Sequence, residues 1–147
     1  MNINYYNNFG VSAVAIGAVL NTSHSLSISK TFLIFPLLSH QKLLQHLSRK
    51  TTKIKSIEKL ISDETGYFSN FSERYMDSLV ITINSIQYLN DTGYIEISDG
   101  VIKSIKKLDY NNKMGNRAKN FFKASENISS LLKETENKLY LNLRVEI

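Results

Sequence analysis

The chain has no cysteine among its 147 residues. This excludes disulfides, thiol catalysis and thiolate metal sites, and it fits a reducing compartment. The longest mostly apolar run near the start, Val11 to Leu20, is well short of the ~20 residues that cross a bilayer. Met1 to Phe9 also lacks the basic residues of a signal peptide. We therefore expect a cytoplasmic protein that does not span a membrane.

Motifs for catalysis and cofactor binding are also missing. No glycine-rich loop leads into Gly-Lys-Ser or Gly-Lys-Thr, so nucleotide binding is not expected. The histidines, His24, His40 and His46, form no i,i+4 zinc pair. Asp63 and Glu64 have no partnering histidine, which favours a solvated helix end over a general acid and base. We expect no enzymatic activity, metal or cofactor, and we favour a hydrogen-bonded helix histidine at His40 over an interface or proton-sensitive role.

Length and charge indicate one basic domain. With 42% hydrophobic residues, the chain is long enough for one ordinary core, so we expect a single domain over residues 1–147. Its net charge of +5 would help association with nucleic acid or another anionic partner. Asn, Lys and Ile are used heavily throughout, as in an A/T-rich coding sequence, so part of this charge reflects composition.

A tight β-hairpin is predicted at Asp99-Gly100, because a type I′ turn needs positive φ at both central residues. A two-residue loop fixes the register of the two strands. One face then carries mainly isoleucine and the other a cross-strand ion pair. The predicted pairs are Ser98 with Val101, Ile97 with Ile102, Glu96 with Lys103, and Ile95 with Ser104.

The segment before the hairpin is predicted to be a helix that ends in the turn Asn90–Gly93. Its apolar positions recur at helical spacing: Leu79, Val80, Ile83, Ile86 and Leu89. A β-branched run over residues 80–83 leaves a strand as the alternative. A helix followed by a hairpin is typical of a winged-helix module, here with a core at about residues 56–105. Residues 76–90 contain no Lys or Arg, so we interpret this segment as a packing helix that does not read DNA.

The remaining pattern is mostly helical, and the predicted fold class is α+β. We expect a first helix over residues 11–21, a polar loop over 21–25, and a short helix at Ile57–Ile61 that stops near Thr65-Gly66. Around Pro36 we expect a kinked helix, or a short helix followed by a second one that starts at the proline. A long C-terminal amphipathic helix carries a stripe from Phe121 to Leu139, and Glu134 with Lys138 forms an i,i+4 pair. The alternation over residues 141–147 predicts a closing strand against the hairpin.

The order of these features resembles a known family. An Asn-rich start and a small-residue helix lead to the run Phe32–His40, then to a basic stretch, the hairpin, a long helix and an apolar tail. This resembles the middle component of three-component ABC systems, the small subunit of Lamassu-type anti-phage defence operons. Pro36 and His40 match the family's motif. The resemblance implies a non-catalytic subunit that links an SMC-like ABC ATPase to an effector, commonly a nuclease, in an assembly that responds to invading DNA.

Two main hypotheses follow. The leading one is a protein-binding adaptor that meets DNA mainly through its complex, with partner-binding candidates Asn8, Phe9, Phe35, Pro36, His40, Tyr88 and Tyr94. The alternative is a winged-helix DNA-binding transcriptional regulator. Its phosphate contacts would be Lys103, Lys106, Lys107, Lys113, Arg117, Lys119 and Lys123. A small regulatory enzyme subunit is a third, weaker hypothesis.

Overall fold

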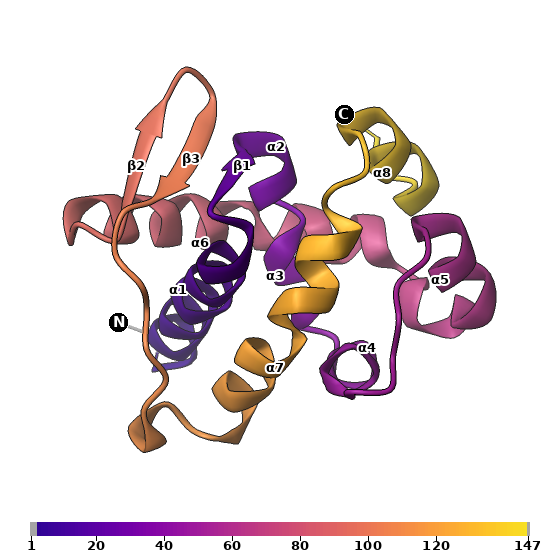
Figure 1. Cartoon of the computed structure of the whole chain (residues 1–147), viewed down its shortest axis with the longest axis horizontal. Helices are drawn as coiled ribbons and strands as arrows, with labels where there is room; N and C mark the ends of the chain where they lie inside the picture. Colours follow the sequence, from indigo (N-terminus) through magenta and orange to yellow (C-terminus); the bar gives the residue numbers. More distant parts are fainter. Residues whose placement is uncertain (1–2, 147) are drawn as a thin grey trace.

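The computed structural model describes the backbone of residues 3–146 and the side chains of residues 9–146 (Figure 1). Its helices are α1 (Ile3–Ser23), α2 (Ile28–Thr31), α3 (Ile34–Leu38), α4 (Gln41–Ser48), α5 (Ile57–Asp63), α6 (Phe71–Asp91), α7 (Asn116–Leu131) and α8 (Glu136–Leu143). Short 3₁₀ turns lie at Thr65–Phe68 and Asn112–Met114. The strands are β1 (Ser25–Ser27), β2 (Ile95–Ser98) and β3 (Val101–Ser104). Mostly helical structure with one small antiparallel sheet confirms the α+β class.

Helix α1 is the centre of the packing. It contacts α6, α7 and α3, and its end contacts β3. All residues from Ala15 to Leu20 are buried, as expected for a helix that is apolar on every side. The Asn21 side chain extends this packing to the chain after the hairpin, because its amide group donates to the Leu108 carbonyl at 2.7 Å and its oxygen accepts from the Leu108 N–H at 2.9 Å.

The predicted hairpin is confirmed in position and register. Asp99 has φ 53° and Gly100 has φ 76°, as a type I′ turn requires. The four predicted pairs are the observed ones, and the isoleucine face supplies Ile95 and Ile102 to the core. The predicted ion pair is wrong: within the described residues, Glu96 and Lys103 face each other without an N···O contact of 4.0 Å or less.

The third strand was not predicted, and it begins at Ser25, the last residue of the segment that we expected to be a polar loop. β1 pairs with β3, giving the sheet order β1-β3-β2 (Figure 1). Leu26 lies opposite Ile102 and is buried. β1 pairs along its whole length with β3, but it contains a single apolar residue between two serines. Its sequence is therefore too short and too polar to show the apolar alternation that predicts a strand. The polar-loop prediction for residues 21–25 is wrong, because residues 21–23 belong to α1 and Ser25 belongs to β1. The partner of the hairpin is β1 instead of a closing strand.

The C-terminal predictions need two corrections. The long amphipathic helix is divided into α7 and α8, because Thr135 takes extended angles and its side chain accepts a hydrogen bond from the Lys138 N–H at 3.3 Å. The predicted strand over residues 141–147 is wrong. Its first three residues belong to α8, where Leu143 is buried and Leu141 is 80% exposed, so the alternating leucines do not share a face. Ile147 lies outside the described residues.

The other helix predictions hold with modest changes. α1 starts earlier than predicted, α5 and α6 are helices, and the strand alternative for residues 80–83 is wrong. Near Pro36 the second alternative is closer, since two short helices form and Pro36 lies in the first turn of α3, where its missing N–H costs little. One hydrophobic cluster runs from Ala13 to Val145. The single-domain and winged-helix assignments stay predictions.

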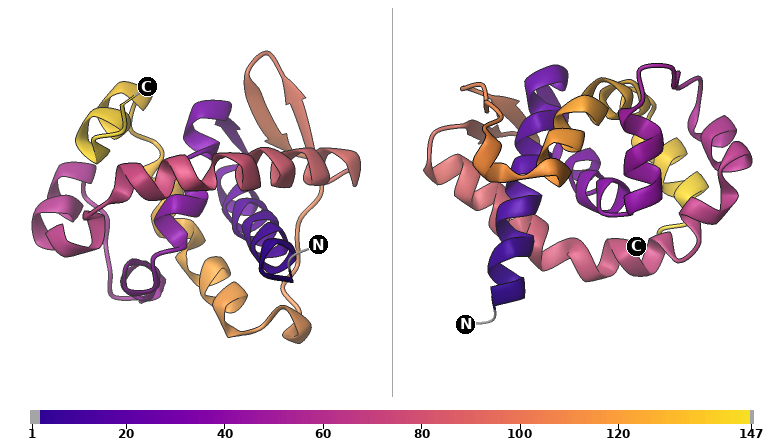
Figure 2. Two further views of the ribbon diagram at one scale, coloured as in Figure 1. Left: turned by 180° about the vertical axis from the view of Figure 1, so that it is seen from behind. Right: turned by 90° about the horizontal axis from the view of Figure 1, so that it is seen from below.

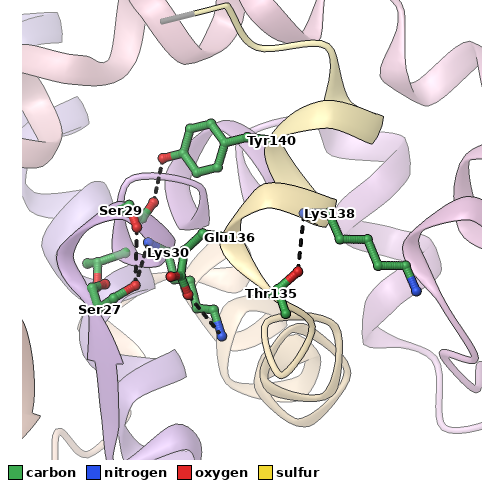
Figure 3. A network of polar contacts seen from close by, with 8 residues as sticks. Ser27, Ser29, Lys30, Thr135, Glu136, Lys138 and Tyr140 are labelled. Atoms are coloured by element: carbon green, nitrogen blue, oxygen red, sulfur yellow. Dashed lines mark hydrogen bonds and ion pairs between the residues drawn. The ribbon is translucent and has the colours of Figure 1, made fainter.

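Helix α8 is attached to α2 by a small polar network (Figure 3). The Tyr140 hydroxyl donates to the Ser29 carbonyl, and Glu136 forms an ion pair with Lys30 at 3.5 Å. Tyr75 adds a second contact, with its hydroxyl 3.1 Å from that of Tyr140. Burial is the main cause that raises the pKa of Tyr140 above its usual value, followed by the hydrogen bond between Tyr140 and Tyr75. None of the described helices combines the length and the apolar character needed to cross a membrane.

Replacing Gly100 tests the hairpin. A Cβ at Gly100 would meet no atom within 4 Å, so a substitution costs only backbone strain at positive φ. Gly100→Val should lower the free energy of unfolding by about 1 kcal/mol or more, measured by chemical denaturation. Gly66→Ala is the matched control, because Gly66 is equally open and has no positive φ. Equal stability of the two variants would contradict the type I′ turn.

A second prediction concerns two buried hydroxyl groups. Among the described residues, only Ser12 of α1 and Thr82 of α6 have a buried side-chain oxygen without a hydrogen-bond partner. Because Thr82→Val keeps the shape and removes this desolvated oxygen, it should stabilise the protein by about 1 kcal/mol in denaturant titrations. Ser85→Ala is the control and should destabilise it, since the Ser85 hydroxyl donates to the Ile81 carbonyl at 2.8 Å. A destabilised Thr82→Val variant would show that the Thr82 hydroxyl has a partner.

Candidate functional site

Helix α6 has two different faces. Its inner face is buried and consists of Phe71, Tyr75, Ser78, Thr82, Ser85, Ile86 and Leu89. On the opposite side, Met76, Val80 and Ile83 follow the spacing i, i+4, i+7 and remain 55%, 63% and 51% exposed. We call these three residues the outer α6 face. Single exposed apolar side chains are ordinary, but three in one row on a helix form a patch that is typical of an interaction surface.

The outer α6 face lies on an open side of the molecule. Seen from behind, α6 crosses the width of the protein in front of α1 and α3 (Figure 2). Its inner face packs on these two helices. The helix therefore presents its outer row along an unobstructed side, where a partner helix could lie along it.

The charges around this face are acidic, although the whole chain is basic. Glu73 and Asp77 lie at one end of the row and Asp91 at the other, and none of the three forms an ion pair within the described part of the chain. Arg74 turns inward, where its guanidinium group donates to the carbonyl groups of Pro36, Tyr67 and Ser69. Burial lowers the pKa of Arg74. The outer α6 face is thus aliphatic with an acidic border.

Two of the predicted partner-binding residues meet beside this face. The rings of Phe9 and Tyr88 pack edge to face with centroids 5.5 Å apart. The Ser85 hydroxyl shares its one proton between the Ile81 carbonyl of its own helix at 2.8 Å and the Phe9 carbonyl of α1 at 3.3 Å, so α1 and α6 are in contact at this crossing. Tyr88 remains 46% exposed. The side chain of Asn8 lies outside the described residues.

Three of the other four predicted partner-binding residues have internal roles, and the fourth, Tyr94, is half-buried. Phe35 and Pro36 are buried in α3. His40 is the N-cap of α4, where its Nδ1 accepts a hydrogen bond from the Leu43 N–H at 3.1 Å. Burial, with smaller effects of Arg74 and Lys42, lowers the pKa of His40, which favours the neutral ring that this hydrogen bond needs. These contacts agree with the hydrogen-bonded helix histidine, and the partner contacts of these residues stay predictions.

The predicted phosphate-contact residues are distributed along the molecule. Lys103 is in β3, Lys113 is in the 3₁₀ turn before α7, and these elements lie at opposite ends of the view in Figure 1. Lys106 lies 5.2 Å from the centre of the half-buried Tyr94 ring, and Lys107 is 4.0 Å from Asp109.

The remaining three predicted contacts belong to α7 and have different surroundings. Arg117 donates to the Ser39 carbonyl at 3.3 Å, and burial lowers its pKa. Lys119 and Lys123 are exposed and one turn apart. The structure therefore does not gather the seven cations into one patch, and their contact with DNA stays a prediction.

Sequence reasoning missed the outer α6 face because it assigned all apolar positions of this helix to one side. Val80 and Ile83 were grouped with Ile86 and Leu89, yet only the latter two are buried. The signal was present in the sequence. The small polar residues Ser78, Thr82 and Ser85 form a second row at helical spacing, and this row is buried on the inner face.

Residues 15–147 match the family model of the ABC-three component (ABC-3C) system Middle Component 3. The chain belongs to this family. No curated protein and no solved structure matches it. Middle Component 3 is part of a system with further components. The outer α6 face is therefore a candidate surface for contact with one of them. Within the described residues, no three His, Asp or Glu side chains lie together as a metal site.

Proposed function

We propose that this Middle Component 3 protein is a non-catalytic adaptor that binds its partner components through protein contacts. The observation that carries the proposal is the outer α6 face, where Met76, Val80 and Ile83 are each more than half exposed on one side of a helix. Burying aliphatic groups of this size contributes about 1.5–3 kcal/mol for each fully buried side chain. A short row of this kind is enough to anchor a partner helix.

The acidic border indicates the chemistry of that partner. Glu73, Asp77 and Asp91 leave negative charge around the aliphatic row, with no cation between Met76 and Asn90 to neutralise it. We expect the partner to be an amphipathic helix with aliphatic residues at its centre and Lys or Arg at its edges. Like charges would disfavour an acidic surface at the same place.

For the identity of the partners we propose an SMC-like ABC ATPase and an effector such as a nuclease, in an anti-phage complex of the Lamassu type. Membership in a three-component ABC family supports this proposal. The resemblance of the Phe32–His40 run points the same way. Within this proposal we assign the outer α6 face to the ATPase component.

The alternative, a winged-helix regulator, has less support. A helix that reads the major groove needs Arg, Lys, Asn or Gln aimed at base edges and cations that neutralise phosphates. The outer side of α6 carries aliphatic groups, carboxylates and the amides of Gln87 and Asn90, but the residues from Met76 to Asn90 include no Lys or Arg to neutralise phosphates. This surface would repel the DNA backbone.

Charged substitutions on the outer α6 face test the adaptor. The protein should co-elute with the ATPase component in gel filtration at moderate salt, because a largely apolar interface is weakly screened. Val80→Glu with Ile83→Glu should weaken this complex by at least about tenfold, since two charges would be buried against the partner. The thermal midpoint of the free variant should stay close to that of the unchanged protein, because both positions are exposed.

The control variant carries Lys103→Gln, Lys106→Gln and Lys107→Gln, which should leave the complex intact. A complex that survives both glutamates contradicts the assignment of α6. Separate elution of the unchanged protein and the ATPase at saturating concentrations contradicts the adaptor function itself. A complex with the effector alone that depends on Val80 and Ile83 would assign the face to the effector instead of the ATPase.

A further inference from the structure

A cationic cleft lies between the end of α4 and the exposed side of α7. Its volume is about 680 Å³. Arg49, Lys50 and Lys53 line it from the segment after α4, and Lys123 lines it from α7. The cleft thus joins a basic stretch of the sequence to a cation more than sixty positions away.

Hydrogen bonds hold the walls of this cleft in place. The Asn127 side-chain amide donates to the Leu47 carbonyl at 2.8 Å and joins α7 to the end of α4. The Thr52 hydroxyl donates to the His46 carbonyl at 2.7 Å and folds the segment after α4 back on that helix. On the far wall, the Thr22 hydroxyl donates to that of Ser125 at 3.1 Å. The cleft is therefore preformed.

The cations of the cleft are free to meet a ligand. Arg49, Lys50, Lys53 and Lys123 are all exposed, and none of them forms an ion pair within the part of the chain that the structure describes. Glu126 is the one carboxylate among the lining residues. Four cations that face one carboxylate across a narrow space attract anions more strongly than the same charges spread over an open surface.

We propose that this cleft binds the phosphodiester backbone of duplex DNA without sequence preference. Lys and Arg side chains are among the usual protein contacts to phosphate oxygens, and four of them line this cleft. Arg49 also brings a planar group that can donate two parallel hydrogen bonds to one phosphate.

The lining residues favour duplex DNA over single strands. A single-strand site stacks bases on aromatic side chains, and the one ring at this cleft, Phe122, already packs against Tyr110 with centroids 5.7 Å apart. The Asn127 amide, which could read a base, is engaged by Leu47. The hydroxyl groups of the cleft also donate within the protein. What remains at the cleft is positive charge, which recognises the phosphate backbone.

The cleft and the outer α6 face lie on different sides of the molecule. Seen from below, α6 runs along one side, and α7 with the connection after α4 runs along the other, with α1 and α3 between them (Figure 2). A partner helix on α6 and a DNA strand at the cleft would not compete for space.

Salt-dependent DNA binding tests the proposal with the full chain. We would measure fluorescence anisotropy of a labelled mixed-sequence duplex between about 50 and 200 mM salt. The unchanged protein should bind weakly, with a slope of log affinity against log salt of up to about 3.6 for four phosphate contacts at ~0.9 each. Replacing Arg49, Lys50, Lys53 and Lys123 with Gln should remove most of this slope and lower the affinity at low salt at least about tenfold.

The matched control replaces Lys103, Lys106, Lys107 and Lys113 with Gln, which removes the same net charge outside the cleft. It should retain most of the affinity and slope. An equal loss in both variants would overturn the proposal, because binding would then follow net charge alone. Tighter binding to a single strand than to a duplex of equal length, or unchanged binding by the cleft variant, would also overturn it. Thermal midpoints within about 2 °C of the unchanged protein, as expected for surface substitutions, would confirm that both variants are folded.

Discussion

The burial of α1 from Ala15 to Leu20 is the constraint on which the rest of this structure depends. A helix that is apolar on every side must be covered by several other elements, and here α6, α7, α3 and β3 supply the cover. The Leu108 side chain packs directly on Gly17, since a Cβ added at this glycine would lie 2.6 Å from it. One turn later, Asn21 holds both backbone polar groups of Leu108. The chain after the hairpin is thereby fixed, and with it the direction in which it approaches α7.

Helix α6, one of the elements that cover α1, has two different faces. The inner side of α6 carries large apolar groups, as in an ordinary surface helix, together with the small polar residues Ser78, Thr82 and Ser85. The Ser85 hydroxyl lies next to the Phe9 carbonyl of α1. What is unusual is the outer side, where Val80 and Ile83 add large aliphatic groups that are more than half exposed.

The parts of the fold that could be predicted from the sequence are those with local causes. The turn at Asp99-Gly100 needs only the positive φ of two residues, so the hairpin and its register were predicted correctly. β1 could not be predicted in this way, because its pairing depends on β3, more than seventy residues later, and only Leu26 in it is apolar. The break before α8 was missed for a related reason. The apolar stripe continues across it, and the Thr135 cap and the bond from the Ile57 N–H to Glu134 at 2.8 Å decide the direction of the chain.

The candidate sites likewise combine features that are visible in the sequence with features that depend on tertiary packing. The basic stretch after α4 and Lys123 of α7 were each visible in the sequence, but only tertiary packing puts them on facing walls. The outer α6 face was hidden by an assumption that apolar positions belong to the core, and the row of small polar residues on the other side of the helix was the signal against it. Phe9 and Tyr88 were proposed separately and do meet, because α1 crosses α6 at that point.

Acidic and basic side chains lie on different sides of this molecule, which the net charge alone does not reveal. The chain carries +5 overall, yet the residues from Met76 to Asn90 contain no cation, and the unpaired cations of the cleft lie on the other side of α1. An aliphatic surface with an acidic border binds through burial and is weakly screened by salt, whereas a cationic cleft loses affinity steeply as salt rises. Two surfaces of opposite character on a rigid helical core would let one small subunit hold a protein partner firmly while DNA exchanges rapidly beside it.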